Sequence, residues 1–322
     1  SAVAAPVAMA DAPTVYGQAN IGIEMSSVDG GASGQNLDNR NSRLGFKGSD
    51  DLGNGLKAVY QFEFVVDPTV SGGNMDSRNS FVGVSGGFGT VLLGRHDTPL
   101  RMIQPSDPFV NSQYTGNNRS TFNGGLEGED RLDEVVAYLS PDFNGIKLAV
   151  AGSGQTALKN ATDDESLTNG TSLSVTYGSK KSGIFAAVAM TSTSVDTGNH
   201  ANDRTRATVQ YNEAGILASF MYNQEADVGN TMTLTGAYKM GALTPKVKAA
   251  MVTYDDKSTA GVTGKDSAMN IAVGVNYALG KSTTLSADYA MLGEGNRSSK
   301  NGNVLSGDAA TTAISIGLSH KF

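Results

Sequence analysis

The sequence contains no cysteine, no tryptophan and only three histidines in 322 residues. Without cysteine, the protein has no disulfide, no zinc-thiolate site and no thiol nucleophile. The histidines His96, His200 and His320 are far apart in the sequence, and neither a G-x-S-x-G motif nor a phosphate-binding loop motif occurs. The sequence therefore gives little support for catalysis, and we expect neither an enzyme nor a bound cofactor or metal.

The sequence also lacks an excess of basic residues and long apolar runs. Its net charge is −7 and its pI is near 5.0, which argues against a nucleic-acid-binding protein with a globally basic surface. No run approaches the roughly 20 apolar residues that a transmembrane helix needs. Transmembrane β-strands remain compatible with the sequence, because each needs only about 9–11 residues of alternating polarity.

The first ten residues, SAVAAPVAMA, form a short apolar run that ends in small residues before Asp11. This ending resembles the cleavage end of a secretory signal peptide, and a disordered N-terminal tail is the alternative. We predict a signal-peptide remnant at residues 1–10 and a single domain at residues 11–322, located outside the cytoplasm.

What the sequence does contain is an alternation of apolar and polar residues with a period of two, which predicts β-strands. From Thr14 to Met25 the apolar residues fall on odd positions. Two further alternating segments, 42–47 and 56–64, flank the sequence DDLGNG at 50–55, whose Asn and Gly tolerate positive φ. The three segments predict a strand followed by a β-hairpin.

Hairpins of this kind recur to the end of the chain, with short turns alternating with longer polar loops. Short turns are predicted near residues 86–89, 141–145, 180–183, 212–215, 241–244 and 279–282. Longer loops are predicted near residues 26–39, 66–77, 96–133, 154–170, 194–203, 225–229, 255–267 and 292–309. The pattern predicts an all-β fold, a transmembrane antiparallel up-and-down β-barrel of about sixteen strands.

The polarity of the two strand faces distinguishes a membrane barrel from a soluble β-protein. Between residues 269 and 277 one face carries Met269, Ile271 and Val273, while the other carries Asn270 and Asn276. A barrel of about sixteen strands cannot fill its interior with such polar residues as a dry core, so this face lines water and the apolar face meets lipid. The alternative is an ordinary sandwich core. The predicted outward aromatics, which would form interfacial girdles, are Tyr60, Phe62, Tyr138, Tyr177, Tyr211, Phe220, Tyr222, Tyr238, Tyr277 and Tyr289.

Several motifs resemble those of a general porin of the Gram-negative outer membrane, and the resemblance covers essentially the whole chain after Asp11. They are SRLGFKG (42–48) with DLGNGLKA (51–58), FVG (81–83) through Gly94-Arg95, Tyr138 with SP (140–141) and FNG (143–145), and IGLSHKF (316–322). The resemblance implies a homotrimer of sixteen-stranded barrels in the outer membrane, in contact with lipid and lipopolysaccharide. The aliphatic outward faces of the first and last strands also suit burial against a neighbouring copy.

The resemblance also implies roles for three segments. The stretch 96–133, which lacks sustained apolar alternation, is expected to fold into the lumen as a constriction loop. Loop 66–77 is expected to latch onto the adjacent barrel. The alternating end of the chain, with Leu318, His320 and Phe322, is similar to the signal read by the barrel-assembly machinery, and an ordinary lipid-facing closing strand is the alternative.

The inward face of the predicted strands is rich in basic residues. They are Arg43, Lys47, Lys57, Arg95, Arg131, Lys147, Arg204, Arg206, Lys246 and Lys248. The constriction loop carries the acids Asp107, Glu127, Glu129 and Asp130. Facing rows of opposite charge would create a transverse field across a narrow aqueous passage. The alternative is that the basic side chains hold the loop in place through salt bridges.

These observations predict a passive diffusion channel for small hydrophilic solutes and ions, with weak to moderate anion preference because the wall cations lie in the confined lumen. A solute-selective porin with a binding track of Arg and Lys is one alternative. An outer-membrane barrel enzyme is another, which the scattered histidines oppose. The acid groups Glu129-Asp130 and Asp163-Asp164-Glu165 predict solvated loop charge, with a loop Ca²⁺ site as the alternative.

Overall fold

The computed structural model describes residues 12–72, 75–116, 122–154, 166–167, 169–193, 203–255, 266–296, 298–300, 303–305 and 309–322. Within these ranges the chain is almost entirely β-strand, with one short helix, α1 (Pro99–Met102). No helix in the described ranges is long and apolar enough to cross a membrane. The predicted signal-peptide remnant at 1–10 lies outside the described residues.

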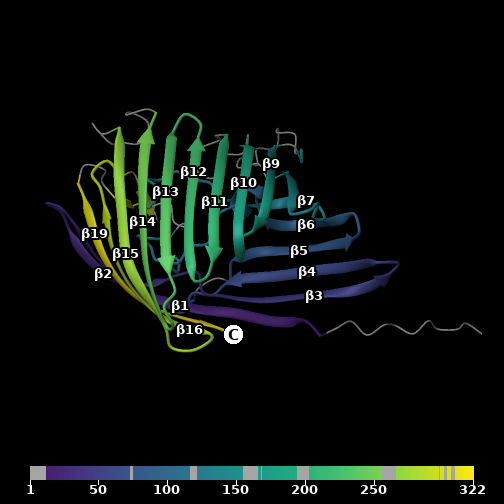
Figure 1. Cartoon of the computed structure of the whole chain (residues 1–322), viewed down its shortest axis with the longest axis horizontal. Helices are drawn as coiled ribbons and strands as arrows, with labels where there is room; N and C mark the ends of the chain where they lie inside the picture. Colours follow the sequence, from purple (N-terminus) through teal and green to yellow (C-terminus); the bar gives the residue numbers. More distant parts are fainter. Residues whose placement is uncertain are drawn as a thin grey trace, which may run out of the picture.

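The strands follow one another along the chain as antiparallel neighbours (Figure 1). They are β1 (Thr14–Val28), β2 (Ser33–Asn39), β3 (Arg43–Gly53), β4 (Leu56–Val65), β5 (Ser77–Gly86), β6 (Gly89–Asp97), β7 (Arg131–Leu139), β8 (Ile146–Ser153), β9 (Gly170–Ser179), β10 (Ser182–Thr193), β11 (Arg204–Glu213), β12 (Ile216–Glu225), β13 (Gly229–Tyr238), β14 (Leu243–Tyr254), β15 (Ser267–Ala278), β16 (Thr283–Leu292), β17 (Ser298–Lys300), β18 (Asn303–Leu305) and β19 (Thr311–Lys321).

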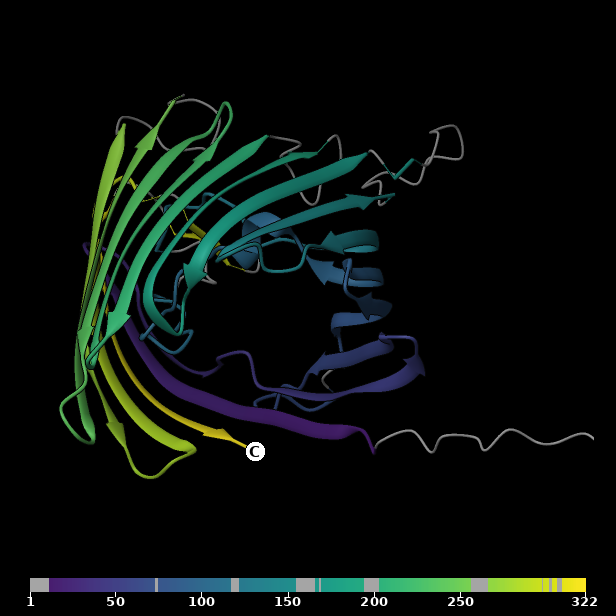
Figure 2. The same ribbon diagram turned by 45° about the vertical axis from the view of Figure 1, so that its right-hand side comes forward.

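The sheet closes on itself because β1 pairs with β19 along one edge and with β2 and β3 along the other. Strands β2 and β3 pair with successive parts of β1 and are interrupted only at residues 40–42, so together they act as one strand. With this pair counted once, the sheet is a closed antiparallel barrel of sixteen strands. The predicted fold class is confirmed, and Figure 2 shows the ring of strands obliquely.

The alternation of faces follows the sequence pattern. In β15, Met269 and Val273 are exposed on the outer surface, whereas Asn270 and Ala272 are buried on the lumenal side. Each register pair keeps this parity, since directly opposed residues in an antiparallel ladder project to the same face. An apolar outer surface is what a barrel in lipid requires.

One part of the lumenal face departs from the predicted polarity. Across β4 to β8 the inward positions include Val59, Phe81, Leu92, Val135 and Ala137, which pack into one apolar cluster. The register aligns Val59 with Gly83, Gly83 with Leu92 and Leu92 with Ala137, all on the lumenal side. The expectation of a uniformly polar lumen was therefore wrong for this sector.

The turns confirm most of the predicted hairpins and correct the loop map. Asn54 and Gly55 have positive φ, 54° and 76°, at the turn between β3 and β4. The segment 26–39 is mostly strand, because β1 runs to Val28 and β2 pairs back on it. The predicted loop 225–229 is only a tight connection between β12 and β13, and β17 and β18 form a small separate hairpin within 292–309.

Candidate constriction site in the lumen

The long segment between β6 and β7 enters the barrel instead of projecting from it. It begins after Asp97 with α1, whose N-cap Thr98 accepts a hydrogen bond from the Arg101 backbone N–H at 3.1 Å and whose first residue is Pro99. Proline is suited to this position because its missing N–H would have no helical partner there. In Figure 2 this blue helix lies inside the ring of strands. We call the described residues 98–116 and 122–130 the constriction loop.

Wall side chains hold the constriction loop by its backbone carbonyls. Asn20 in β1 donates to the carbonyl of Val110 at 2.9 Å, and Asn270 in β15 donates to that of Phe122 at 2.9 Å. The hydroxyl of Tyr254 in β14 donates to the Gly124 carbonyl at 2.9 Å. The loop therefore lies against the inner face of the barrel from β9 through β16 and β19 to β1, which we call the covered wall.

The covered wall is shaped for this contact. Phe109 and Phe122 of the loop are fully buried against small inward residues, including Ala250, Ala272 and Ala290. Burying two aromatic side chains against alanine contributes a few kcal/mol, about 1.5–3 kcal/mol for each ring. The loop is thus held by apolar packing as well as by hydrogen bonds.

Three of the four predicted loop acids make close ion pairs with cations of the covered wall. Asp107 lies 2.8 Å from Lys248 Nζ, and Glu129 lies 2.8 Å from Arg206 Nη1. Asp130 Oδ2 lies 2.5 Å from Arg204 Nη1. The structure therefore brings Arg204 and Arg206 into contact with the acids, as the salt-bridge alternative describes, rather than leaving them opposite the acids across water.

The fourth acid, Glu127, has a different environment. Its side chain is 46% exposed and lies 3.5 Å from Arg204 Nη2. Arg204 also contacts Glu225 of the neighbouring strand at 3.1 Å, so its charge is shared among three carboxylates. Glu127 is consequently the loop acid whose charge reaches the open water most directly.

The carboxylate of Glu129 lies beside Arg206, and its side chain is 17% exposed. Burial raises the pKa of its carboxyl, although the neighbouring guanidinium groups of Arg206 and Arg101 lower the pKa in part and Asp130 raises it further. A buried carboxyl with a raised pKa takes up its proton before ordinary surface carboxylates do.

Facing the constriction loop, the inner faces of β3 to β7 form what we call the open wall. Arg43 in β3 lies 3.5 Å from Glu63, and Arg78 in β5 forms a shorter ion pair with the same carboxylate. The phenol of Tyr16 donates to Glu63 at 3.0 Å. One carboxylate is thus shared by two arginines, which leaves local positive charge.

Arg131 adds a third arginine to the open wall, next to the end of the constriction loop. Its Nη2 lies 2.8 Å from Asp97 Oδ1 and its Nε donates to Asn79 Oδ1 at 2.7 Å. Arg101 of α1 contacts the same aspartate at 3.1 Å. Arg43, Arg78 and Arg131, on alternate strands β3, β5 and β7, form what we call the arginine row. Together with Arg101 they set four cations against the two carboxylates Glu63 and Asp97.

The remaining predicted wall residues lie elsewhere. Arg95 pairs in register with Ser80, which pairs with Phe62 on the outer surface, so Arg95 has the outward parity of Val91 and Leu93. Arg95 forms an ion pair with Asp133 there. The inward assignment of Arg95 was therefore wrong.

The predicted wall lysines Lys147 and Lys47 lie away from the constriction loop. Lys147 lies at the short-turn end, 51% exposed, and its Nζ is 3.3 Å from Asp142 Oδ2 in the turn. Lys47 faces the lumen below the arginine row, with its Nζ 5.0 Å from the centroid of the Tyr16 ring. Neither lysine belongs to the constriction itself.

Sequence reasoning missed three cations that make ion pairs or hydrogen bonds inside the barrel. Arg40 is fully buried beside Glu24, at 2.9 Å, and lies between the predicted loop 26–39 and the predicted strand 42–47. Arg78 was missed because a register shift between Phe62 and Phe64 turns it inward against the simple alternation. Lys180 lies in a short turn yet donates to carbonyls of the constriction loop.

The described residues contain no group of three or more His, Asp or Glu side chains arranged to hold a metal ion. Glu129 and Asp130, considered as a calcium site, are engaged by Arg206 and Arg204. The second acidic group, Asp163-Asp164-Glu165, lies outside the described residues.

Comparison with known proteins places these observations in context. A family model described as "Gram-negative porin" matches residues 1–320. The major outer membrane protein P.IB of Neisseria meningitidis serogroup A is 30% identical over 99% of this chain and 97% of its own length. An anion-selective porin from Comamonas acidovorans superposes with a TM-score of 0.74 at 23% identity, covering 97% of this chain and 99% of that one. The trimer form of OmpT from Vibrio cholerae superposes with a TM-score of 0.66 at 17% identity, covering 97% of this chain and all of that one.

Proposed function

This chain belongs to the family of Gram-negative porins, and on that premise we propose how its lumen selects among solutes. The protein is an outer-membrane channel for the passive diffusion of small hydrophilic solutes and ions. We propose that the arginine row opposite the constriction loop gives the channel weak to moderate anion preference.

The arginine row carries the proposal. Arg43, Arg78, Arg131 and nearby Arg101 are balanced by only Glu63 and Asp97, so the open wall has two excess positive charges. In a narrow lumen few waters separate a permeating ion from these charges, and their potential is felt more strongly than that of loops at the mouth. An anion therefore meets a favourable potential at the constriction.

The covered wall, together with the constriction loop, carries excess negative charge. The carboxylates of Asp107, Glu127, Glu129, Asp130, Glu225 and Asp288 outnumber Lys180, Arg204, Arg206, Lys246 and Lys248 by one. Most of these groups are buried in ion pairs, and Glu127 is the exposed one. The two walls thus create a transverse field that orients dipolar solutes and disfavours apolar ones, while the more exposed cations favour anions.

Reversal potentials in a KCl gradient across a planar bilayer test the selectivity. We expect a potential of the sign that marks chloride as the more permeant ion. A cation-selective wild-type channel would overturn the assignment. Solute flux that rises linearly with concentration supports a general pore, whereas flux that saturates for inorganic anions would favour the solute-selective alternative.

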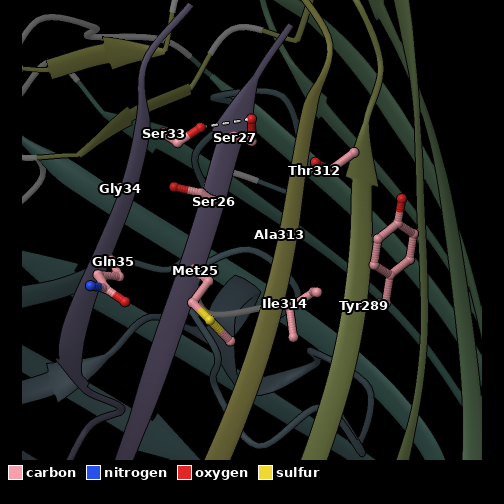
Figure 3. A pocket seen from close by; sticks show the side chains of 10 residues that line it. All are labelled: Met25, Ser26, Ser27, Ser33, Gly34, Gln35, Tyr289, Thr312, Ala313 and Ile314. Carbon is pink, nitrogen blue, oxygen red and sulfur yellow. Dashed lines mark hydrogen bonds between the residues drawn. The ribbon is translucent and has the colours of Figure 1, made fainter.

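We also propose a homotrimer, with the outer faces of β1, β2, β16 and β19 at the subunit interface. Across these strands Met25 pairs in register with Gln35 and Ile314, and Ile314 pairs with Tyr289. They line an outer groove of about 470 Å³, whose upper part carries the Ser33 to Ser27 hydrogen bond at 3.0 Å (Figure 3). Aliphatic and small polar side chains in a shallow groove suit a protein neighbour.

The trimer form of the structurally similar OmpT supports this proposal through the shared fold. Native mass measurement in detergent should give three times the monomer mass of 33.2 kDa. A monomer under these conditions would overturn the trimer. Loop 66–77 remains the proposed latch onto the neighbouring barrel.

A further inference from the structure

The apolar sector of the lumen lies directly below the arginine row, toward the short-turn end. Its half-buried members Val59, Phe81 and Leu139 surround Leu92, which is almost fully buried. The register places Val59 opposite Ser49 and Phe81 opposite Gln61, both on the lumenal side. An apolar patch that faces the water of a diffusion channel is a place where an apolar solute body can be desolvated.

This patch forms one side of a cavity of about 470 Å³. The cavity is lined by residues of β1 and β3 to β7, among them Lys47, Val59, Gln61, Phe81, Leu92 and Leu139. Its volume is within the range of small-molecule sites, about 300–1,000 Å³. Apolar lining with a few convergent polar groups is the composition typical of such sites.

Lys47 supplies the charge at this cavity. It is an exposed side chain in the lumen, and its Nζ contacts the Tyr16 ring face at 5.0 Å. Within the part of the chain that the structure describes, Lys47 forms no salt bridge. Its neighbours across the ladder are the neutral Thr14 and Gln61. The ammonium group is therefore available to an anionic ligand beside the apolar patch.

We propose that this cavity is a weak binding site for amphipathic organic monoanions, specifically small aromatic carboxylates. Lys47 binds the carboxylate, and Val59, Phe81 and Leu139 contact the ring. This proposal rests on the channel function above, since a solute reaches the cavity only by entering the lumen. Because the cavity is open to the lumen, binding is weak and exchange is fast, as transport requires.

The geometry explains why both parts of the ligand matter. An inorganic anion that passes the arginine row meets Lys47 but gains nothing from the apolar patch. A neutral aromatic solute meets the patch but is disfavoured by the transverse field above it and lacks a partner for Lys47. Only a solute with both groups makes both interactions, which distinguishes this site from general anion selectivity.

Single-channel recording with three probes tests the site in the wild-type protein. Chloride current is measured while sodium benzoate, sodium acetate or benzyl alcohol is added at equal concentrations. We expect benzoate to reduce the chloride current in a saturable manner, and acetate and benzyl alcohol to have half-saturation concentrations about tenfold higher or more. Equal effects of benzoate and acetate would overturn the proposal.

Two variants with a matched control localise the effect. Lys47→Met and Val59→Ser should each raise the half-saturation concentration of benzoate, the former by about tenfold. Lys147→Met removes the same charge at the turn end and should leave benzoate block as in the wild type. If Lys47→Met fails to insert, Lys47→Gln takes its place. Unchanged benzoate block in both site variants would overturn the proposal.

The outcomes separate this site from the channel function. A wild-type channel with anion-selective chloride current but no saturable benzoate effect rejects the site and leaves the porin function intact. Absence of chloride conductance in the wild type would instead reject the selectivity mechanism on which the site rests.

Discussion

The guanidinium of Arg204 in β11 contacts the carboxylate of Asp130 in the constriction loop, with Nη1 2.5 Å from Oδ2. The same side chain is 1% exposed and also pairs with Glu225. Removing one member of such a buried network leaves uncompensated carboxylates and costs about 3–5 kcal/mol. Arg204→Gln should therefore lower the thermal unfolding midpoint and release the end of the loop, seen as increased open-channel current noise.

Lys147→Gln is the control for this prediction, since Lys147 is 51% exposed and its ion pair among the described residues is with the turn residue Asp142. A surface pair of this kind contributes about 0–1 kcal/mol. Equal noise and equal unfolding midpoints in the two variants would show that Arg204 does not hold the loop.

The barrel was predictable from sequence because lipid and water impose the same period-two pattern on every strand. The individual lumen residues were less predictable, because a single irregularity changes the face of a side chain. The register shift in β4 and β5 turns Arg78 inward. The inward assignment of Arg95 was a different kind of error, because simple alternation after the exposed Val91 and Leu93 already places Arg95 on the outer face.

The contacts of the constriction loop could not be predicted either. Pairs such as Lys248 with Asp107 or Asn270 with Phe122 join residues more than a hundred positions apart. Nothing local in the sequence indicates whether an inward cation meets a loop acid or open water. The charged residues of the loop and wall could be listed from the sequence, but their partners could not.

The contacts of Lys180 with the constriction loop indicate that the short-turn end helps to position the loop. Its Nζ donates to the carbonyls of Met102 and Gln104 at 2.9 and 3.0 Å, at the end of α1. Burial lowers the pKa of this lysine. Lys180→Met leaves both carbonyls without this donor, so we expect closures at lower voltage in single-channel recordings.

The neighbouring Lys181 is the matched control, because its side chain is exposed and its described hydrogen bonds, with Ser179 and Asn212, are made by its backbone. Lys181→Met should gate at the wild-type voltage. If both lysine variants gate alike, the contacts of Lys180 with the loop are not what stabilises the open channel.

Glu129 predicts a pH dependence of selectivity. Its pKa is raised by burial, so on acidification it becomes neutral before ordinary surface carboxylates. Arg206 then loses its partner, and the net positive charge facing the lumen increases. Anion preference should therefore rise from neutral to mildly acidic pH, measured as reversal potential in a KCl gradient.

Protonation of Glu129 also makes the stability of the folded channel depend on pH. Because the folded-state pKa of Glu129 lies above its unfolded value, the folded channel binds this proton more tightly, and the associated stability is lost as pH rises through the folded-state pKa. Glu129→Gln should show raised anion preference already at neutral pH and a weaker response to acid. If Glu129→Gln changes its anion preference with pH as much as the wild type does, another group causes the pH dependence.

We expect the loss of Phe322 to affect assembly in cells more than folding in detergent. The backbone of Phe322 exchanges hydrogen bonds with Gly17 at 3.0 and 3.2 Å, and its ring covers the space where a Gly17 side chain would lie. The ring is 62% exposed on the outside. Deleting Phe322 should lower the yield of trimer in the outer membrane severalfold while leaving refolding in micelles close to normal.

Phe322→Tyr keeps an outward aromatic ring and serves as the control, with near-normal yield in cells. Heat-modifiable bands on semi-native gels measure both fractions. Equal losses in cells and in micelles would assign Phe322 a role in barrel closure rather than in recognition by the assembly machinery.

Arg78 gives the most direct test of the arginine row, because it shares the carboxylate of Glu63 with Arg43 and was identified only from the structure. Arg78→Glu places two acids side by side and removes the excess positive charge of the open wall. We expect the chloride-to-potassium permeability ratio to fall by a factor of about three or more, toward cation preference. Lys147→Glu makes the same change of two charges at the exposed turn end, where solvent screens it, and should leave the ratio nearly unchanged. If the two variants shift the reversal potential equally, selectivity is set by total charge and not by the arginine row.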